Sequence, residues 1–244
     1  MGVPRADGFF GNCDKNNIKN YRTRCSAIIL SQEKNILIDT SPDLRTQLID
    51  NNIKKIDKVI YSHPHADQTH GINDLRIFFL KNKKLIDVYA DKLTCNYLKN
   101  TFKYCFNKTS EYPATLKLNK LKKILNFTNK KHKLIIKSIP VRHGKINSLS
   151  FIINNKIAYA SDVDLIYSKD LKFFKKLNYF VIDCLRYKSH PSHYNLDQII
   201  KLVDFLKPKK TILTNLHTDM DYLKLKNFLP KNIIPAHDGM KILF

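Results

Sequence analysis

The chain alternates short apolar runs with polar loops, and this pattern predicts a mixed α/β fold. Short apolar runs that are bounded by turn-forming residues are typical of buried strands. In the first half of the chain, such runs predict strands at residues 25–30, 35–39, 59–61 and 86–89. In the second half, they predict strands at residues 134–140, 148–153, 156–160, 179–183 and 210–214, and apolar stretches at residues 233–234 and 240–244 close the chain.

Helices are predicted where apolar residues recur at helical spacing. Leu44, Leu48 and Ile49 predict a helix at residues 43–53, and Pro42 suits its first turn. Further helices are expected at residues 92–106, around residues 173–174, and at residues 196–206 and 220–228.

Two blocks of strands, each followed by helices, predict a sandwich of two similar halves. At 244 residues and 43% hydrophobic composition, the chain can bury a full core, so we expect one domain over residues 1–244. The glycine- and asparagine-rich residues 2–24 predict an ordered loop, and the lysine-rich residues 108–131 show no clear period, so no element is predicted there.

The formal net charge of +22 would ordinarily favour a polyanionic partner. The excess is almost all lysine, and it is scattered with asparagine and isoleucine along the whole chain rather than gathered in an arginine-rich or aromatic-interleaved patch. We therefore predict no specific nucleic-acid partner. A positive field would still concentrate small phosphorylated substrates.

Targeting and redox features favour a cytoplasmic protein without a membrane partner. The N-terminus lacks a basic region followed by an apolar stretch, and no run approaches the roughly 18 apolar residues of a membrane helix. The five cysteines are odd in number and form no CxxC pair, so we interpret them as reduced thiols.

The strand predicted at residues 59–61 ends at Ser62 in a loop that is rich in metal-binding side chains. His63 and His65 are two residues apart, so an extended backbone would point both imidazoles to the same side, where they could bind one cation. Asp67 is two residues further on, so in an extended backbone its carboxylate would point to the same side and could bind a neighbouring ion. Because such a motif alone has a real false-positive risk, distant ligands are required.

Three more polar clusters directly follow predicted strands in the second half of the chain: His143, Asp162, and Asn215 with His217. Strand ends are where sheets of this kind place their ligands. A single strand-terminal histidine is more often structural than ligating, but this series of separate clusters is hard to explain by solvation alone.

The strand followed by His-x-His-x-Asp at residues 63–67 resembles the metallo-β-lactamase superfamily. The likeness covers nearly the whole chain, and it is similar in detail to the branch that contains PhnP, a phosphoribosyl 1,2-cyclic phosphate phosphodiesterase. The stretches that carry it are residues 2–5, 22–26, 38–45, 74–76, 161–162 and 236–240. The resemblance implies the metallo-β-lactamase αββα four-layer sandwich and a metal-dependent hydrolase.

The same resemblance implies a set of metal ligands. A first metal would be bound by His63, His65 and His143. A second would be bound by Asp67, with Asp162 bridging both ions. We expect one or two divalent ions, either Zn²⁺ or Mn²⁺.

The resemblance also implies supporting residues. Asp39 would orient a ligand histidine by a hydrogen bond, and His193 would protonate the leaving oxygen, although it could equally be an ordinary loop histidine. Arg22, Arg24 and Arg76 are candidates for binding phosphate, because guanidinium binds such oxygens through two donors. Surface or structural ion pairs are the alternative for all three arginines.

Two positions depart from the family pattern. Gln68 and Asn215 stand where histidines are expected, and each is followed two residues later by a histidine, His70 and His217 respectively. In an extended chain a two-residue step keeps the direction of the side chain, so we predict that His217 replaces the ligand directly. Alternatively, the carbonyl oxygens of Gln68 and Asn215 complete a harder site that suits Mn²⁺ or Mg²⁺ better than Zn²⁺.

The N-terminal region departs from the pattern as well. The family normally opens with a strand before Gly-Val-Pro, whereas this chain begins at Met1-Gly2, so either the start is misassigned or this edge strand is missing. Of the cysteines that form an extra zinc site in PhnP only Cys13 remains, so no structural zinc is predicted there.

These features predict a metal-dependent phosphodiesterase that hydrolyses a small, cyclic or linear phosphodiester through a metal-bound hydroxide. One alternative is a tRNA 3′-end endonuclease of the same fold, for whose gripping arm only residues 108–131 are available. Another is a non-catalytic nucleic-acid-binding relative whose second metal site has decayed at Gln68 and Asn215. Lactam hydrolysis is disfavoured because those enzymes are exported. A homodimer is compatible with the sequence.

Overall fold

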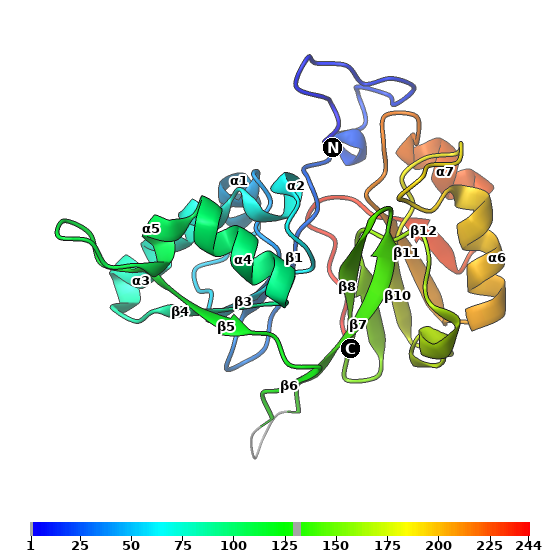
Figure 1. Ribbon diagram of the computed structural model, residues 1–244. Helices are drawn as coiled ribbons and strands as arrows, with labels where there is room; N and C mark the ends of the chain where they lie inside the picture. The colour runs from blue at the N-terminus through cyan, green and yellow to red at the C-terminus, as the bar shows by residue number, and fades with distance from the viewer. Residues whose placement is uncertain (1, 129–132) are drawn as a thin grey trace. The chain divides into compact units, whose positions relative to one another are not determined.

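A computed structural model describes residues 2–128 and 133–244, and the chain divides into two compact units (Figure 1). The continuous unit is Arg24–Leu121, and the discontinuous unit combines Met1–Thr23 with Lys122–Phe244. Each unit contains its own sheet and its own hydrophobic cluster, which agrees with the predicted mixed α/β class. The expectation of one domain over residues 1–244 stays a prediction.

The continuous unit is a five-stranded sheet in the order β1-β2-β3-β4-β5. Its strands are β1 (Ala27–Ile29), β2 (Ile36–Ile38), β3 (Lys58–Ile60), β4 (Ile86–Ala90) and β5 (Leu116–Lys120). The first pair is antiparallel, and the other pairs are parallel. Its helices are α1 (Leu44–Asp50), α2 (Ala66–Thr69), η2 (Ile72–Leu75), α3 (Arg76–Asn82), α4 (Lys92–Thr101) and α5 (Lys103–Phe106).

Burial on both faces explains why β3 reads as an unbroken apolar run. Val59, Ile60 and Tyr61 are fully buried, as is usual for a central strand of a parallel sheet. The Tyr61 hydroxyl lies 2.7 Å from Oγ1 of Thr40, so its polar end is also satisfied in the core. This strand carries the chain directly into the histidine loop.

One predicted helix of this unit is wrong in its extent. The helix expected at residues 92–106 is broken into α4 and α5, because Phe102 leaves the helical conformation with φ −119° and ψ 37°. The Phe102 ring is buried and packs edge-on against the rings of His70 and Tyr97, which compensates for the interrupted helix.

The discontinuous unit is a seven-stranded sheet in the order β12-β11-β10-β9-β8-β7-β6. Its strands are β6 (Ile124–Asn126), β7 (Ile135–His143), β8 (Ile146–Ile153), β9 (Ile157–Ala160), β10 (Tyr179–Asp183), β11 (Lys210–Thr214) and β12 (Ile233–Pro235). Strands β6 to β9 are antiparallel neighbours, and β9 to β12 are parallel. Its helices are η1 (Ile18–Asn20), η3 (Ser168–Phe173), α6 (Leu196–Leu206) and α7 (Tyr222–Phe228).

Local sequence explains the main helix of this unit. The Asn195 side chain accepts a hydrogen bond from Gln198 N, and the Gln198 side chain accepts one from Asn195 N, which forms a capping box at the start of α6. Ile199, Val203 and Leu206 then bury one face of α6 in the core. The helix predicted at residues 196–206 is therefore confirmed.

One other expectation is wrong. The described part of residues 108–131 contains β5 and β6, although no element was predicted there; residues 129–132 lie outside the described residues. In β5 the buried Leu116 and the half-buried Leu118 alternate with the polar Lys117 and Asn119, a two-residue period that the surrounding lysines obscure. Residues 240–244 form no regular element, and Leu243 is exposed.

No helix within residues 2–128 and 133–244 combines the length and the apolar character that a membrane crossing demands.

We expect the core of the discontinuous unit to be sensitive to Phe180. This residue of β10 is fully buried, and its ring centroid lies 5.8 Å from that of Phe174. Phe180→Ala should lower the free energy of unfolding by about 3–5 kcal/mol, measured by urea denaturation. Phe228→Ala is the control, because Phe228 is 70% exposed and its loss should change the same quantity by less than about 0.5 kcal/mol. Equal losses would contradict the assignment of this core.

Candidate metal centre

Asp39 fixes the start of the histidine loop in the continuous unit. It directly follows β2 and has a left-handed backbone with φ +60°, a conformation that aspartate tolerates better than most residues. Its Oδ1 accepts a hydrogen bond from Ser62 N, and its Oδ2 accepts one from Ser62 Oγ, both at 2.7 Å. Two buried hydrogen bonds therefore hold the residue that precedes His63.

The serine hydroxyl transmits this arrangement to His63. Ser62 Oγ lies 2.9 Å from Nδ1 of His63. Because the single hydroxyl proton is donated to Asp39, Oγ accepts from Nδ1–H, and this selects the tautomer in which Nε2 carries the lone pair. Asp39 was predicted to orient a ligand histidine by a hydrogen bond. In the structure its contact with His63 runs through the hydroxyl of Ser62, a residue to which the sequence had assigned no role.

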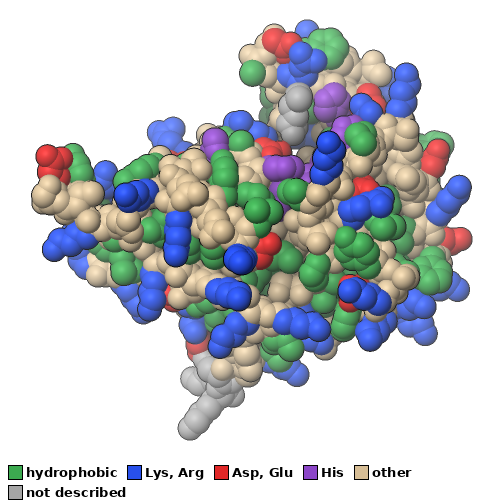
Figure 2. Space-filling model, in the orientation of Figure 1, with side chains coloured by type: hydrophobic (Ala, Val, Ile, Leu, Met, Phe, Trp, Pro, Cys, Tyr) green, Lys and Arg blue, Asp and Glu red, His purple; other side chains and the backbone are tan. Residues whose placement is uncertain are grey.

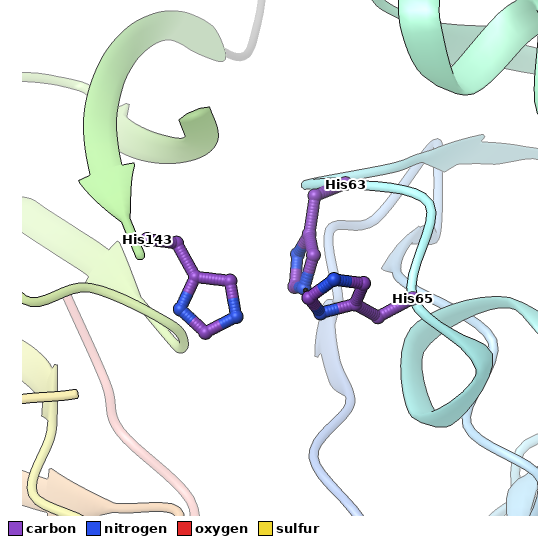
Figure 3. A group of neighbouring side chains, drawn as sticks. All are labelled: His63, His65 and His143. Atoms are coloured by element: carbon purple, nitrogen blue, oxygen red, sulfur yellow. Dashed lines mark hydrogen bonds between the residues drawn. The ribbon is translucent and has the colours of Figure 1, made fainter. Parts of the chain in front are cut away.

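His63 and His65 present their ring nitrogens to each other, and both come from the loop after β3 (Figure 3). Nε2 of His63 and Nδ1 of His65 are 3.1 Å apart. Two nitrogens bound to one zinc ion at about 2.0–2.1 Å and an angle of roughly 100° have this separation. The pair therefore fits a divalent metal by both spacing and donor chemistry.

The other polar residues of the motif belong to a helical turn. Helix α2 begins at Ala66, so the argument that Asp67 continues an extended parity with His65 is wrong, and Asp67 lies instead in the first turn of α2. Nε2 of His70 lies 2.9 Å from the Tyr97 hydroxyl. Gln68 is buried, and its backbone carbonyl accepts a hydrogen bond from Thr40 N at 2.7 Å.

The discontinuous unit carries a second cluster at its strand ends. His143 is the last residue of β7 and Asp162 follows β9; both are buried. Nδ1–H of His143 donates to the Ser192 carbonyl at 2.7 Å, which leaves Nε2 as the nitrogen that faces Asp162, 4.0 Å from its Oδ1. A ligand histidine commonly has its other ring nitrogen bound to a backbone carbonyl in this way.

His193 joins this cluster through a residue that sequence reasoning missed. Nδ1 of His193 lies 2.5 Å from Oδ2 of Asp183 and 4.0 Å from Oδ1 of Asp162. Potential ligand atoms of His143, Asp162 and His193 all lie within 4.8 Å of one another. Asp183 is the last residue of β10, so the strand-end rule that selected His143 and Asp162 would also have found it.

The carboxyl group of Asp183 is fully buried. Burial, and secondly the negative charge of Asp162, raise the pKa of Asp183 well above its ordinary range. Its Oδ2 also accepts a hydrogen bond from Val163 N at 3.1 Å. The 2.5 Å contact between this oxygen and Nδ1 of His193 places one proton between the two groups.

Asn215, rather than His217, contacts this cluster. Asn215 has φ +60°, so the chain beyond β11 is not extended and the two-residue parity argument for His217 is wrong. Nδ2 of Asn215 donates to Asp162 at 3.5 Å and to Asp183 at 3.4 Å. The clusters of potential ligand atoms found among the described residues do not include His217, whose Nδ1 lies 3.2 Å from Thr218 Oγ1.

The three arginines proposed to bind phosphate are engaged within their own units. Arg22 is buried and donates to backbone carbonyls, including that of Met220 at 2.6 Å. Arg24 forms a two-donor ion pair with Asp43, and this hydrogen bonding lowers the pKa of Asp43. The exposed Arg76 lies over the Tyr112 ring, 5.3 Å from its centroid. Arg22 and Arg24 therefore have structural partners, and phosphate binding by the three arginines stays a prediction.

The hydroxyl that connects Asp39 to His63 can be tested directly. Ser62→Ala should weaken the binding of Zn²⁺ about 10- to 100-fold, because the hydrogen bond between Ser62 Oγ and Nδ1 of His63, which selects the His63 tautomer, is lost. Isothermal titration calorimetry measures the affinity, and Ser31→Ala is the control, since that serine only bonds Lys34 within its own turn. Unchanged affinity in Ser62→Ala would show that the hydroxyl does not orient His63.

Comparison with known proteins identifies the class. Residues 34–215 match the beta-lactamase superfamily domain, and the chain belongs to this superfamily. Its strand-end histidines and carboxylates agree with a hydrolase of the metallo-β-lactamase fold, a fold that generally binds divalent metals. The predicted metallo-β-lactamase fold is thus confirmed.

Two solved structures refine the comparison. The chain is similar to a diphosphatase from the PhnP family, with a TM-score of 0.87 and 29% sequence identity, over 100% of this chain and 93% of that chain. This confirms the predicted likeness to the PhnP branch. Human tRNase Z, short form, matches with a TM-score of 0.67 and 15% identity, over 90% of this chain and 92% of that chain, a likeness that shows the fold alone.

A curated relative is considerably longer than this chain. An octanoyltransferase of Porphyromonas gingivalis is 29% identical over 248 residues, which cover 99% of this chain and 49% of that protein. The chain therefore spans about half the length of this relative.

Proposed function

We propose that the chain is a metal-dependent phosphodiesterase that acts on a small, cyclic or linear phosphodiester. The observation that carries the proposal is the cluster of His143, Asp162 and His193, whose ligand atoms lie within 4.8 Å of one another at the strand ends of a protein similar to a PhnP-family diphosphatase. We further propose that it works in the cytoplasm, with no nucleic-acid or membrane partner, and leave a homodimer as an option.

The metal ligands of the proposal follow the family resemblance. They are His63, His65 and His143 for one ion, and Asp67 for a second, with Asp162 shared. The position of Asn215 beside Asp162 favours its amide over His217 as the remaining ligand. When bound, a divalent metal would supply positive charge for the phosphoryl oxygens and lower the pKa of a coordinated water.

The proton on the leaving oxygen would come from His193. Asp183 accepts from Nδ1 of His193 and so orients the imidazole with Nε2 directed away from this buried pair. Protonated at Nε2, His193 can donate to an alkoxide leaving group, a role that typically contributes about 10²–10⁴-fold in rate. The burial of Asp183 keeps this pair away from competing water.

The surface charge supports a small anionic substrate. Lysine and arginine side chains are spread over the face seen in Figure 2, and this spread agrees with the scattered lysines of the sequence. Such a field attracts phosphorylated molecules without requiring a specific nucleic-acid groove. Arg76 stays the candidate for a direct phosphate contact, because it is exposed.

Metal removal is the experiment that tests the proposal. The purified protein should hydrolyse bis(p-nitrophenyl) phosphate and a cyclic phosphodiester, lose this activity in EDTA, and regain it with Zn²⁺ or Mn²⁺. Release of p-nitrophenol is followed by absorbance, with a metal-independent phosphodiesterase as the control for the chelator. Turnover that survives dialysis against EDTA, or no turnover with either metal, would refute the proposal.

A binding experiment distinguishes the nucleic-acid alternatives. The endonuclease would cleave tRNA precursors, and the non-catalytic relative would bind RNA in a salt-dependent way that His63→Ala leaves unchanged. Under the phosphodiesterase proposal, His63→Ala abolishes turnover and no RNA is cleaved.

A further inference from the structure

Arg22 is a buried arginine at the end of the N-terminal segment, with only 8% of its surface exposed. Its Nη2 donates to the Met220 carbonyl at 2.6 Å and to Asn20 Oδ1 at 3.1 Å. Its Nη1 donates to the carbonyls of His217 and Leu216 at 3.3 and 3.5 Å. One guanidinium thus binds three carbonyl groups of a single turn that lies almost 200 residues further along the chain.

Neighbouring residues of the N-terminal segment bind the same turn. The Thr218 carbonyl accepts from Asn12 N at 2.8 Å and from Cys13 Sγ at 3.3 Å. Gly11 has φ +59°, and a Cβ placed there would lie 2.6 Å from the Thr218 oxygen, so the close approach depends on glycine. Four carbonyls of residues 216–220 therefore face residues 11–22.

The other end of this turn reaches the strand-end cluster. Asn215, which begins the turn, donates to Asp162 and Asp183 through its Nδ2 group. Because the backbone of Asn215 is left-handed, the chain leaves the extended conformation of β11 there, and strand pairing no longer fixes the position of the turn. Contacts from outside the turn are therefore needed to fix where the Asn215 amide lies.

We propose that Arg22 is a positioning residue for the metal centre: it holds the turn of residues 215–220 so that the Asn215 amide stays beside Asp162 and Asp183. This inference rests on the proposed function. A planar guanidinium presents five N–H donors in a fixed fork that spans several carbonyls, whereas the three donors of a lysine ammonium all leave from one nitrogen. The arginine therefore acts on the reaction through Asn215, without contact with substrate.

The test compares two substitutions that weaken the contacts between residues 11–22 and the turn of residues 215–220 with a control substitution in the same N-terminal segment. Arg22→Lys removes the fork, and Gly11→Ala pushes the segment away from Thr218 without changing any charge. Arg5→Lys is the matched control, because Arg5 pairs with Asp7 at the exposed tip of the segment. Titration calorimetry with Mn²⁺ and kinetics with bis(p-nitrophenyl) phosphate are measured on protein whose circular dichroism matches the wild type.

We expect Arg22→Lys and Gly11→Ala to bind the Mn²⁺ ion of lower affinity about 10- to 100-fold less tightly than the wild type. In both variants kcat should fall by a larger factor than KM rises. Arg5→Lys should leave both quantities unchanged. Millimolar guanidinium should partly restore Mn²⁺ binding to Arg22→Ala, which a general loss of folding would not allow.

The outcomes separate the two proposals. Wild-type protein that binds no Mn²⁺ and shows no turnover overturns the proposed function and the role of Arg22 with it. Active wild-type protein with unchanged Mn²⁺ affinity in Arg22→Lys overturns the role of Arg22 alone. If Arg22→Lys does not fold, unchanged affinity in Gly11→Ala has the same consequence.

Discussion

Asp162→Asn is expected to reduce kcat/KM for bis(p-nitrophenyl) phosphate by at least about 10³-fold. The carboxylate is buried, and its Oδ1 lies 4.0 Å from ring nitrogens of both His143 and His193. Losing its charge removes the anion that the family resemblance places between the metals, and metal-derived charge stabilisation is worth several kcal/mol in the transition state. Initial rates and bound metal, measured by atomic emission, check the prediction.

Asp197→Asn is the matched control for this substitution. Asp197 is an exposed carboxylate in the first turn of α6, so its loss should leave both metal content and kcat/KM within about twofold of the wild type. Full activity and stoichiometric metal in Asp162→Asn would contradict the proposed centre, because the strand-end carboxylate would then have no part in it.

Asp183→Asn is expected to lower kcat about 10²–10⁴-fold on a phosphodiester with an alkyl leaving group. The substitution replaces the carboxyl that holds His193 through Nδ1 with a neutral amide, which accepts more weakly and stabilises an imidazolium less. On bis(p-nitrophenyl) phosphate the loss should be less than about tenfold, because a nitrophenolate leaves without protonation. Steady-state kinetics on the two substrates measure the difference.

This difference separates an effect on proton transfer from an effect on folding. Asparagine is neutral and nearly the same size as aspartate, and burial already disfavours the charged form of Asp183, so the fold should tolerate the change. Tyr194→Phe serves as the control, because its hydroxyl accepts from Ile166 N, a contact outside the Asp183–His193 pair. Equal losses on both substrates would contradict a role for Asp183 in proton transfer.

Much of the fold could be predicted from the sequence, because parallel strands that are buried on both faces appear in it as short, continuous apolar runs. Val59, Ile60 and Tyr61 are apolar since both faces of β3 are covered, and the strand-end rule then located His63, His143 and Asp162. The same rule would have found Asp183. It was missed only because no metal-binding motif drew attention to the end of β10.

The errors arose where a local rule was extended beyond its backbone conformation. Side chains two residues apart point to the same side only in an extended chain. This rule failed for Asp67, because α2 begins one residue earlier, and for His217, because the backbone of Asn215 is left-handed. Arg22 shows a second kind of limit. The sequence gives the type of donor, but the carbonyls that the guanidinium binds come from the far end of the chain.

The discontinuous unit has a consequence for synthesis on the ribosome. The Asn20 side chain donates to Asp221 across 201 residues, so this contact cannot form until nearly the whole chain has been made. The continuous unit needs only contiguous residues, Arg24–Leu121, and can bury its core much earlier. Nascent chains that stop before β11 should therefore carry one protease-resistant half and an N-terminus that is still open to cleavage.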